Sequence, residues 1–256
     1  MVALGLELMF STAVITSAGG RTYNQDCAGH RTLPCGACWV VADGLGGHRG
    51  GETAASIAVN AVLTDSEAQP FAVNEESVTA WIESANARIL AAQRDDPTLA
   101  DMRTTVAVLA SDHRHFGWCH VGDSRVYAVQ QGRIVPLTKD HSVPQAMCDA
   151  GEITPEQVRF HEDRSRLLRA LGAPSVKPSW SGYLMPVREA DAFLLCTDGF
   201  WEHCTEIEME AEYVKSPDPD EWLARMEGRV RARASGEYDN YTAVAVFVNH
   251  AQGEGA

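Results

Sequence analysis

Four aspartates stand at the ends of stretches that read as buried strands. Asp43 follows the apolar run 37–42, Asp198 lies directly after 192–197, Asp239 precedes 242–248, and Asp123 lies in a turn between two strands. Any one of them alone is typical of a turn aspartate. Strand ends can gather at one rim of a sheet, and four carboxylates there would repel one another unless a divalent cation lay between them. An all-oxygen ligand set favours Mg2+ or Mn2+ over Zn2+.

The glycine-rich stretch ADGLGGHRGG that contains Asp43 looks at first like a nucleotide-binding loop. It lacks the Lys-Ser or Lys-Thr of a P-loop, and Arg49 stands where a dinucleotide fingerprint needs its third glycine. A carboxylate facing a phosphate also requires a cation between them. From this segment alone, two interpretations stay open: Asp43 is a metal ligand, or it caps the helix that follows.

The surrounding elements come in clusters rather than in strict alternation. Apolar and β-branched runs predict strands at 6–16, 37–42, 104–110, 192–197 and 242–248, with two or three more over 115–138, where QQGR forms a hairpin turn. Helical periodicity predicts helices at 51–63, 77–93, 206–214 and 220–234. This order favours an α+β fold with antiparallel sheets. We expect one domain over 1–256, with a polar, partly helical segment at 141–178.

Composition limits the classes of partner. The chain has 256 residues and a formal net charge of -14, which disfavours nucleic acid and anionic membranes as partners. The N-terminus has no basic region of the signal-peptide kind and no apolar run reaches membrane-spanning length, so we expect a cytoplasmic protein. Cys35 and Cys38 form a lone CxxC pair, for which loop and strand thiols are a better interpretation than a zinc or redox site. His113, His115 and His120 are expected on a hairpin surface.

Taken in order, seven motifs resemble the metal-dependent protein phosphatases of type 2C, the PPM family, in its compact bacterial form. They are RTYNQD, VADGLGGH, MRTTVAVL, HVGDSRVYA, LTKDHS, LLCTDGFW and DNYTAVAV. The resemblance covers nearly the whole chain. It implies a four-layer α-β-β-α sandwich, in which two antiparallel sheets are flanked by helices, and it makes 141–178 a flap beside the site.

The resemblance also implies roles for particular residues. Asp43 would be shared by two Mn2+ or Mg2+ ions, and the backbone carbonyl of Gly44 would be a further ligand. Asp198 and Asp239 would complete one metal site, and Asp123 would help Asp198 to hold a possible third, weaker ion. Arg21 would grip the substrate phosphate through a planar, bidentate contact.

Two positions depart from the family pattern. Gln25 stands where some members have a glutamate that helps to hold the second metal. Gln25, Asp26 and Asn240 are therefore expected to contact that metal weakly or through water. Leu45 stands where animal members have a histidine, so His48 is a candidate general acid, with a structural histidine as the alternative. The spacing CxxxxxR from Cys119 to Arg125 falls on the GDSR motif and is interpreted as accidental.

The resemblance therefore implies a metal-dependent protein serine/threonine phosphatase in which metal-activated water attacks phosphoserine or phosphothreonine. Its expected partners are phosphorylated proteins that a Ser/Thr kinase has modified, and a monomer is expected. Two alternatives stay open: a non-catalytic phosphoprotein-binding regulator or metal sensor of the same fold, and a phosphomonoesterase acting on small molecules.

Overall fold

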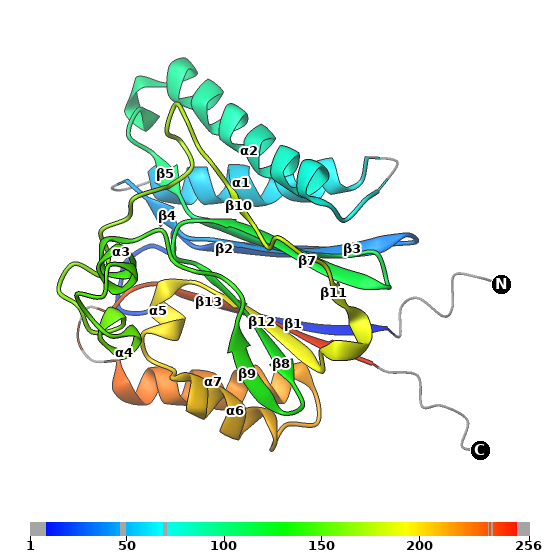
Figure 1. The fold of residues 1–256 in the computed structure, drawn as a ribbon. Helices are drawn as coiled ribbons and strands as arrows, with labels where there is room; N and C mark the ends of the chain where they lie inside the picture. The colour runs from blue at the N-terminus through cyan, green and yellow to red at the C-terminus, as the bar shows by residue number, and fades with distance from the viewer. Residues whose placement is uncertain (1–8, 47–49, 69–70, 235, 237, 250–256) are drawn as a thin grey trace, which may run out of the picture.

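Two antiparallel sheets face each other at the centre of the protein, and helices cover both outer faces (Figure 1). The computed structural model describes residues 9–46, 50–68, 71–234, 236 and 238–249. The four-layer α-β-β-α arrangement expected from the sequence is confirmed. Within the described part of the chain, no helix is both long and apolar enough to cross a membrane.

The first sheet contains the chain's first and last strands, which pair along their whole length from Phe10↔Val248 to Ser17↔Tyr241. Its order is β1 (Phe10–Ser17), β13 (Tyr241–Val248), β12 (Ala192–Cys196), β8 (Arg125–Gln130) and β9 (Arg133–Pro136). In the β8–β9 turn Gln131 and Gly132 both have positive φ, 52° and 74°. This is the geometry of a two-residue hairpin turn, as QQGR predicts.

The second sheet has two strands, at 36–42 and 106–111, that are buried along their whole length. Its order is β10 (Ser179–Trp180), β7 (His115–Val121), β6 (Val106–Ser111), β3 (Gly36–Ala42) and β2 (Cys27–Leu33), and β11 (Met185–Pro186) also pairs with β7. A separate short ladder joins β4 (Gly44–Leu45) to β5 (Arg103–Thr104). The strand predicted at 104–110 is therefore divided, because the chain turns at Thr105 to contact Asp43.

Helices α1 (Gly50–Ser66) and α2 (Glu75–Asp95) cover the second sheet, while α6 (Glu206–Tyr213) and α7 (Pro219–Arg233) cover the first (Figure 1). Asn74 and Asp218 cap α2 and α7 by accepting from backbone amides in the first turn. Each sheet–helix interface is apolar, and a third apolar layer fills the space between the sheets. Burial of these three layers supplies the main driving force for folding.

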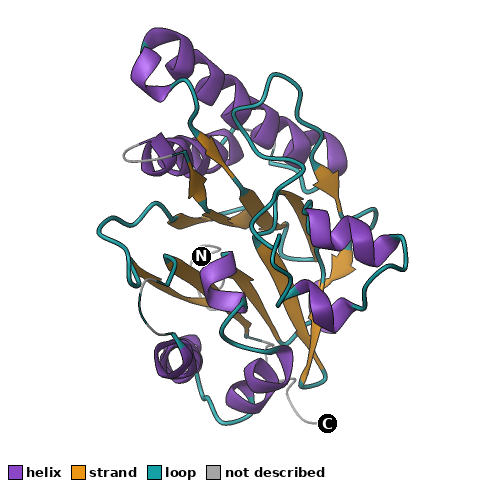
Figure 2. Cartoon of the chain, turned by 90° about the vertical axis from the view of Figure 1, so that its left-hand side faces the viewer, coloured by secondary structure: helices purple, strands orange, loops and turns teal. Residues whose placement is uncertain are grey.

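The segment 141–178 joins β9 to β10 and contains α3 (Val143–Asp149) and α4 (Pro155–Val158). It is partly helical, as expected, and we call it the flap segment. Three further short helices occur: η2 (Pro97–Leu99), η3 (Val187–Glu189) and α5 (Asp198–Trp201). Figure 2 views the end of the molecule that carries α3, α4 and α5.

Candidate metal centre

A cleft of about 440 Å³ opens at the end of the sandwich that carries α3, α4 and α5 (Figure 2). Its walls are formed by loops and turns at the strand ends of both sheets, by β4, by the start of α5 and by the flap segment. It is lined by Arg21, Thr22, Tyr23, Gln25, Asp43, Gly44, Leu45, Gly46, Asp123, Ser165, Leu167, Asp198, Asp239 and Asn240. The structure thus brings together all four aspartates that the sequence placed at separate strand ends. His48 lies outside the described residues.

Asp43 is held through its own backbone by Thr104, the last residue of β5, and by Thr105, which precedes β6. Its amide donates to Thr105 Oγ1 at 2.9 Å, and its carbonyl accepts from Thr104 Oγ1 and from the Thr105 amide, both at 2.8 Å. Thr105 Oγ1 also lies 2.7 Å from Ser124 Oγ, next to Asp123. The sequence showed only a small polar pair at this point, whereas the structure shows that the pair fixes the direction of Asp43.

Gly44 follows in a position that only glycine can occupy. A Cβ atom there would lie 2.1 Å from the Gly51 carbonyl oxygen and 2.6 Å from that of Gln25. This close approach brings the start of α1 against the strand end. The Gly44 amide donates to the Gln25 carbonyl at 3.2 Å, which links the Asp43 turn to the loop that carries Arg21.

Burial and mutual repulsion raise the pKa values of the cleft carboxyls. Burial raises the pKa of Asp43 well above its usual range, and repulsion from Asp198, Asp26, Asp123 and Asp239 adds to the effect. The pKa of Asp198 is raised to about 7 by burial and then by the nearby Glu202 and Asp239 carboxylates. Folding has therefore concentrated negative charge where water is scarce, a costly arrangement typical of functional sites.

Asp26 lies behind the cleft rather than on its wall. Its Oδ2 accepts from Thr197 Oγ1 at 2.8 Å, whereas Oδ1 is buried without a hydrogen-bond partner. Burial raises the pKa of this carboxyl to about 7. Asn240 Oδ1 accepts from the Gln25 amide at 2.8 Å, and its Nδ2 donates to the carbonyls of Ala18 and Tyr23. In this structure the Asn240 side chain thus fixes the loop that precedes β2.

Arg21 and Asp239 form the half-exposed mouth of the cleft. Arg21 Nη2 lies 3.4 Å from Asp239 Oδ2, and about half of each side chain is exposed. A contact this long and this exposed contributes little to stability. The guanidinium is therefore free to turn toward an anion that enters the cleft.

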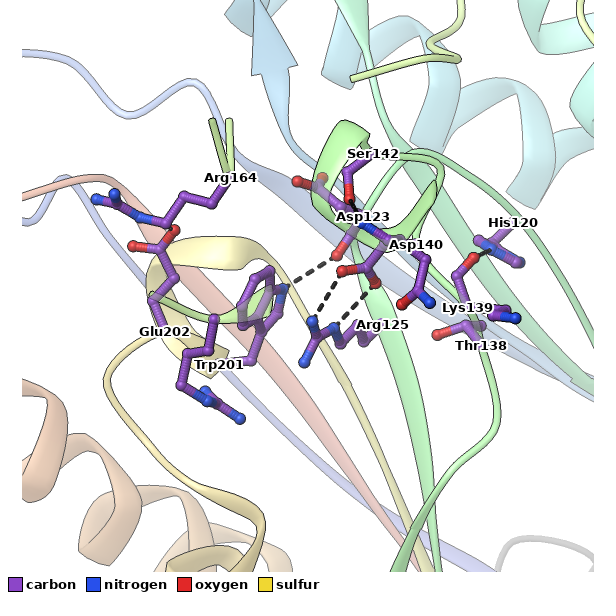
Figure 3. A network of polar contacts seen from close by, with 12 residues as sticks. His120, Asp123, Arg125, Thr138, Lys139, Asp140, Ser142, Arg164, Trp201 and Glu202 are labelled. Atoms are coloured by element: carbon purple, nitrogen blue, oxygen red, sulfur yellow. Dashed lines mark hydrogen bonds and ion pairs between the residues drawn. The ribbon is translucent and has the colours of Figure 1, made fainter. Parts of the chain in front are cut away.

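Asp123 occupies the β7–β8 turn and is only 3% exposed. Burial raises its pKa well above the usual range, with Asp198 and Asp140 adding repulsion. Its carbonyl accepts from Trp201 Nε1 at 3.0 Å (Figure 3). The Arg125 guanidinium lies 3.5 Å from the centroid of the Trp201 ring and makes a bidentate contact with Asp140. The hydrogen bond from Trp201 to the Asp123 turn is a contact that no sequence signal revealed.

Comparison with known proteins agrees with this geometry. The model of the family described as protein phosphatase 2C matches residues 18–237. This chain belongs to the protein phosphatase 2C family. Serine/threonine protein phosphatase PstP of Mycobacterium tuberculosis is 31% identical over 230 residues, which cover 89% of this chain and 43% of PstP. The chain thus spans less than half the length of that relative.

Two further similarities cover nearly all of both chains. Protein phosphatase PhpP of Streptococcus pneumoniae is 28% identical over 251 residues, or 94% of this chain and 99% of PhpP. A crystal structure of the catalytic domain of PstP in complex with two manganese ions has a TM-score of 0.81 and 27% identity, covering 94% of this chain and 99% of that one. The fold of this phosphatase 2C chain is therefore shared over 94% of its length.

The donor set of the cleft fits hard divalent cations. Asp43, Asp123, Asp198 and Asp239 offer carboxylate oxygens and Gly44 offers a carbonyl, and cations would relieve the repulsion that raises the Asp43 and Asp198 pKa values. Among the described residues, no group of three or more His, Cys, Asp or Glu side chains could hold an ion by itself. Backbone carbonyls and water are thus needed to complete the coordination, as Mg2+ and Mn2+ accept readily.

Two cysteine hypotheses can be judged from burial. Cys38 is fully buried in β3, and burial raises its pKa to about 12, which disfavours the thiolate that a redox pair needs. Burial likewise raises the pKa of the Cys119 thiol to about 12, so the CxxxxxR spacing does not provide a nucleophile. His120, expected on a hairpin surface, is only 4% exposed, because β10 and the His141 ring pack against it.

Proposed function

We propose that this chain is a metal-dependent protein phosphatase that hydrolyses phosphoserine and phosphothreonine side chains. The observation that carries the proposal is the half-buried pair Asp43 and Asp198, with Asp239 and Arg21 at the mouth, in a cleft open to solvent. Membership of the protein phosphatase 2C family and the names of the relatives support it.

Each cleft residue has a defined task in this reaction. Asp43, Asp198, Asp239 and the Gly44 carbonyl would hold two Mn2+ or Mg2+ ions, and Asp123 with Asp198 would hold a weaker third. When bound, the cations would lower the pKa of a water molecule and offset the charge that develops on the phosphoryl group. Arg21 would turn from Asp239 to bind two phosphate oxygens and orient the phosphorus for in-line attack.

Three further assignments belong to the proposal. His48 would donate a proton to the leaving alcohol. Gln25, Asp26 and Asn240 would support the second metal through water or through the loop that they fix. Residues 1–256 would act as one cytoplasmic, monomeric domain whose flap segment contacts phosphoproteins made by a Ser/Thr kinase.

The decisive experiment is release of phosphate from a phosphothreonine peptide during separate Mn2+ and Mg2+ titrations, with EDTA as the control. We expect saturable, metal-dependent turnover that EDTA abolishes. A higher kcat/KM for the phosphopeptide than for a sugar phosphate would favour protein substrates over small molecules.

The non-catalytic alternative predicts a different result from the same samples. Tight metal binding by calorimetry without phosphate release at saturating metal would overturn the enzymatic proposal and favour a metal-sensing regulator. Release that is undiminished in EDTA would instead show that the cleft carboxylates do not act through a metal.

A further inference from the structure

The turn that presents Asp123 is held by one histidine outside the set assigned above. The His141 backbone amide donates to the Gly122 carbonyl at 2.9 Å, and the Gly122 amide donates to His141 Nδ1 at 3.1 Å. One residue therefore satisfies both backbone groups of Gly122. Gly122 has a φ of +104°, and a Cβ atom there would lie 2.6 Å from Thr105 Cγ2, so the turn has little room to shift.

The orientation of the His141 ring is fixed on its other sides. Because the Gly122 amide donates to Nδ1, we assign the proton of the neutral ring to Nε2, which lies 2.9 Å from Ser179 Oγ and 3.3 Å from Arg169 Nη1. The His120 ring stacks on it with centroids 4.5 Å apart and planes 8° apart. The Nδ1 lone pair is thus directed at the Gly122 amide by contacts from β7 and β10.

His141 also begins the flap segment. Its carbonyl accepts from the Leu168 amide at 2.7 Å, and the neighbouring Ser142 forms a β-bridge with Leu167. Leu167 and Ser165 line the cleft. A single residue therefore connects the backbone that presents Asp123 to the part of the flap that faces the cleft.

We propose that His141 is a positioning residue for Asp123. By fixing the Gly122–Asp123 backbone, His141 directs the Asp123 carboxylate toward Asp198. Because His141 also begins the flap segment, it couples that segment to the affinity of the site for the weakest-bound ion. An effect of His141 on the rate of phosphate release is expected only if the proposed metal-dependent function holds, so in this respect the inference rests on that function. Its consequence for metal binding can be measured without turnover. A merely structural His141 would change stability and leave the metal-binding isotherm unchanged.

The first test compares two replacements of His141 by calorimetric Mn2+ titration and by EPR counting of bound Mn2+. His141→Asn retains an acceptor near the Nδ1 position, whereas His141→Phe retains a stacking ring without an acceptor. We expect His141→Phe to weaken the lowest-affinity class of sites by roughly 10–100-fold, the usual scale for a lost supporting contact. The tighter sites should change little, and His141→Asn should restore most of the affinity.

The controls separate positioning from general destabilisation. His30→Phe makes the same chemical change at an exposed position of β2 and should leave the isotherm unchanged. If the phenylalanine variant does not fold, His141→Gln, which extends the amide away from the Nδ1 position, provides the same comparison. Thermal unfolding of every variant in EDTA reports stability separately.

A double-mutant cycle with Asp123→Asn tests the coupling directly. If His141 acts through Asp123, then adding His141→Phe to Asp123→Asn should weaken Mn2+ binding no further. The proposal is overturned if the isotherm of His141→Phe matches the wild type, or if its full effect persists without the Asp123 carboxylate. Absence of phosphopeptide turnover with the predicted binding shift intact would refute the proposed function and leave this inference standing.

Discussion

The two ends of the sandwich each carry a hollow of similar size, with opposite chemistry. The cleft of about 440 Å³ contains carboxyls with raised pKa values. The hollow of about 520 Å³ at the opposite end is lined by Met9, His115, Pro186, Val187, Asn249 and the exposed Arg114 and Arg188. Figure 1 shows β11, which contributes Pro186, at the end away from α3, α4 and α5. Volume therefore does not distinguish them. The difference is that exposed arginines remain hydrated at little cost, while buried like charges persist only because the three apolar layers supply the folding energy.

Asp43→Asn should have the largest effect at the cleft end. Removing the central negative charge should lower kcat/KM for a phosphothreonine peptide by about 10³-fold or more, on the scale of losing an electrostatic contribution to catalysis. The metal-free variant should unfold at the same or a higher temperature, because a repelling buried carboxylate is gone. Arg114→Ala at the other end is the control and should leave kcat/KM and the unfolding temperature unchanged. If both variants lost the same amount of kcat/KM, the two ends would not differ in function.

Arg21→Lys should have the next largest effect. Lysine keeps the charge but loses the planar pair of donors, so we expect kcat/KM to fall by roughly 10–100-fold with little change in unfolding temperature. Steady-state kinetics and a thermal melt check both parts. Arg188→Lys serves as the control, and wild-type kinetics in Arg21→Lys would remove Arg21 from the proposed site.

The pH dependence of the free energy of unfolding should also reveal the raised pKa values of the carboxyls in and behind the cleft. In EDTA, the folded protein holds protons on Asp198 and Asp26, whose pKa values are about 7, while the unfolded carboxyls are ionised. Stability should therefore fall as pH rises from 6.5 to 8, by roughly 1–2 kcal/mol in total. Below pH 6.5, buried histidines with lowered pKa values, such as His120 and His141, act in the opposite direction.

Chemical unfolding at pH 6.5, 7.2 and 8 with EDTA measures this slope. Saturating Mn2+ should reverse it, because metal binding strengthens as the carboxyls lose protons. The Asp43→Asn variant should show a smaller slope. A metal-free stability that rises over this range would contradict the raised pKa values.

Gln25→Glu should have the smallest effect. Adding a carboxylate beside the second metal position should lower the half-saturating Mn2+ concentration about 2–5-fold, as additional ligand charge does in oxygen-rich sites. The same change should slightly destabilise the metal-free protein, because it adds to the repulsion in the cleft. Activity measured across a Mn2+ titration tests this, and Arg188→Gln, which makes the net charge more negative by the same amount, is the control. A lower half-saturating Mn2+ concentration in both variants would indicate only a long-range charge effect.

Most elements were predictable because they carry strong local signals. The runs that became β3, β12 and β13 are continuously apolar, and α2 repeats its buried residues at helical spacing. By contrast, β2 contains the polar stretch GHRT and was missed, since its strand conformation depends on pairing with β3. The burial of His120 was missed for the same reason: β10 and His141 arrive from segments distant in sequence.

The amino-acid sequence alone specifies which chemical groups this protein has to work with: carboxylates at strand ends, glycines where the backbone must approach closely, and an arginine for an anion. Those signals are local, because turn residues and apolar runs act over a few positions of the chain. Folding brings a set of four aspartates into one cleft, namely Asp43, Asp123, Asp198 and Asp239. Long-range contacts from Thr105, Trp201 and His141 then hold the turns that present them. The carboxylate charges become strongly coupled only when folding excludes water from between them. That coupling depends on distances between segments far apart in the sequence, so it cannot be inferred from any single segment.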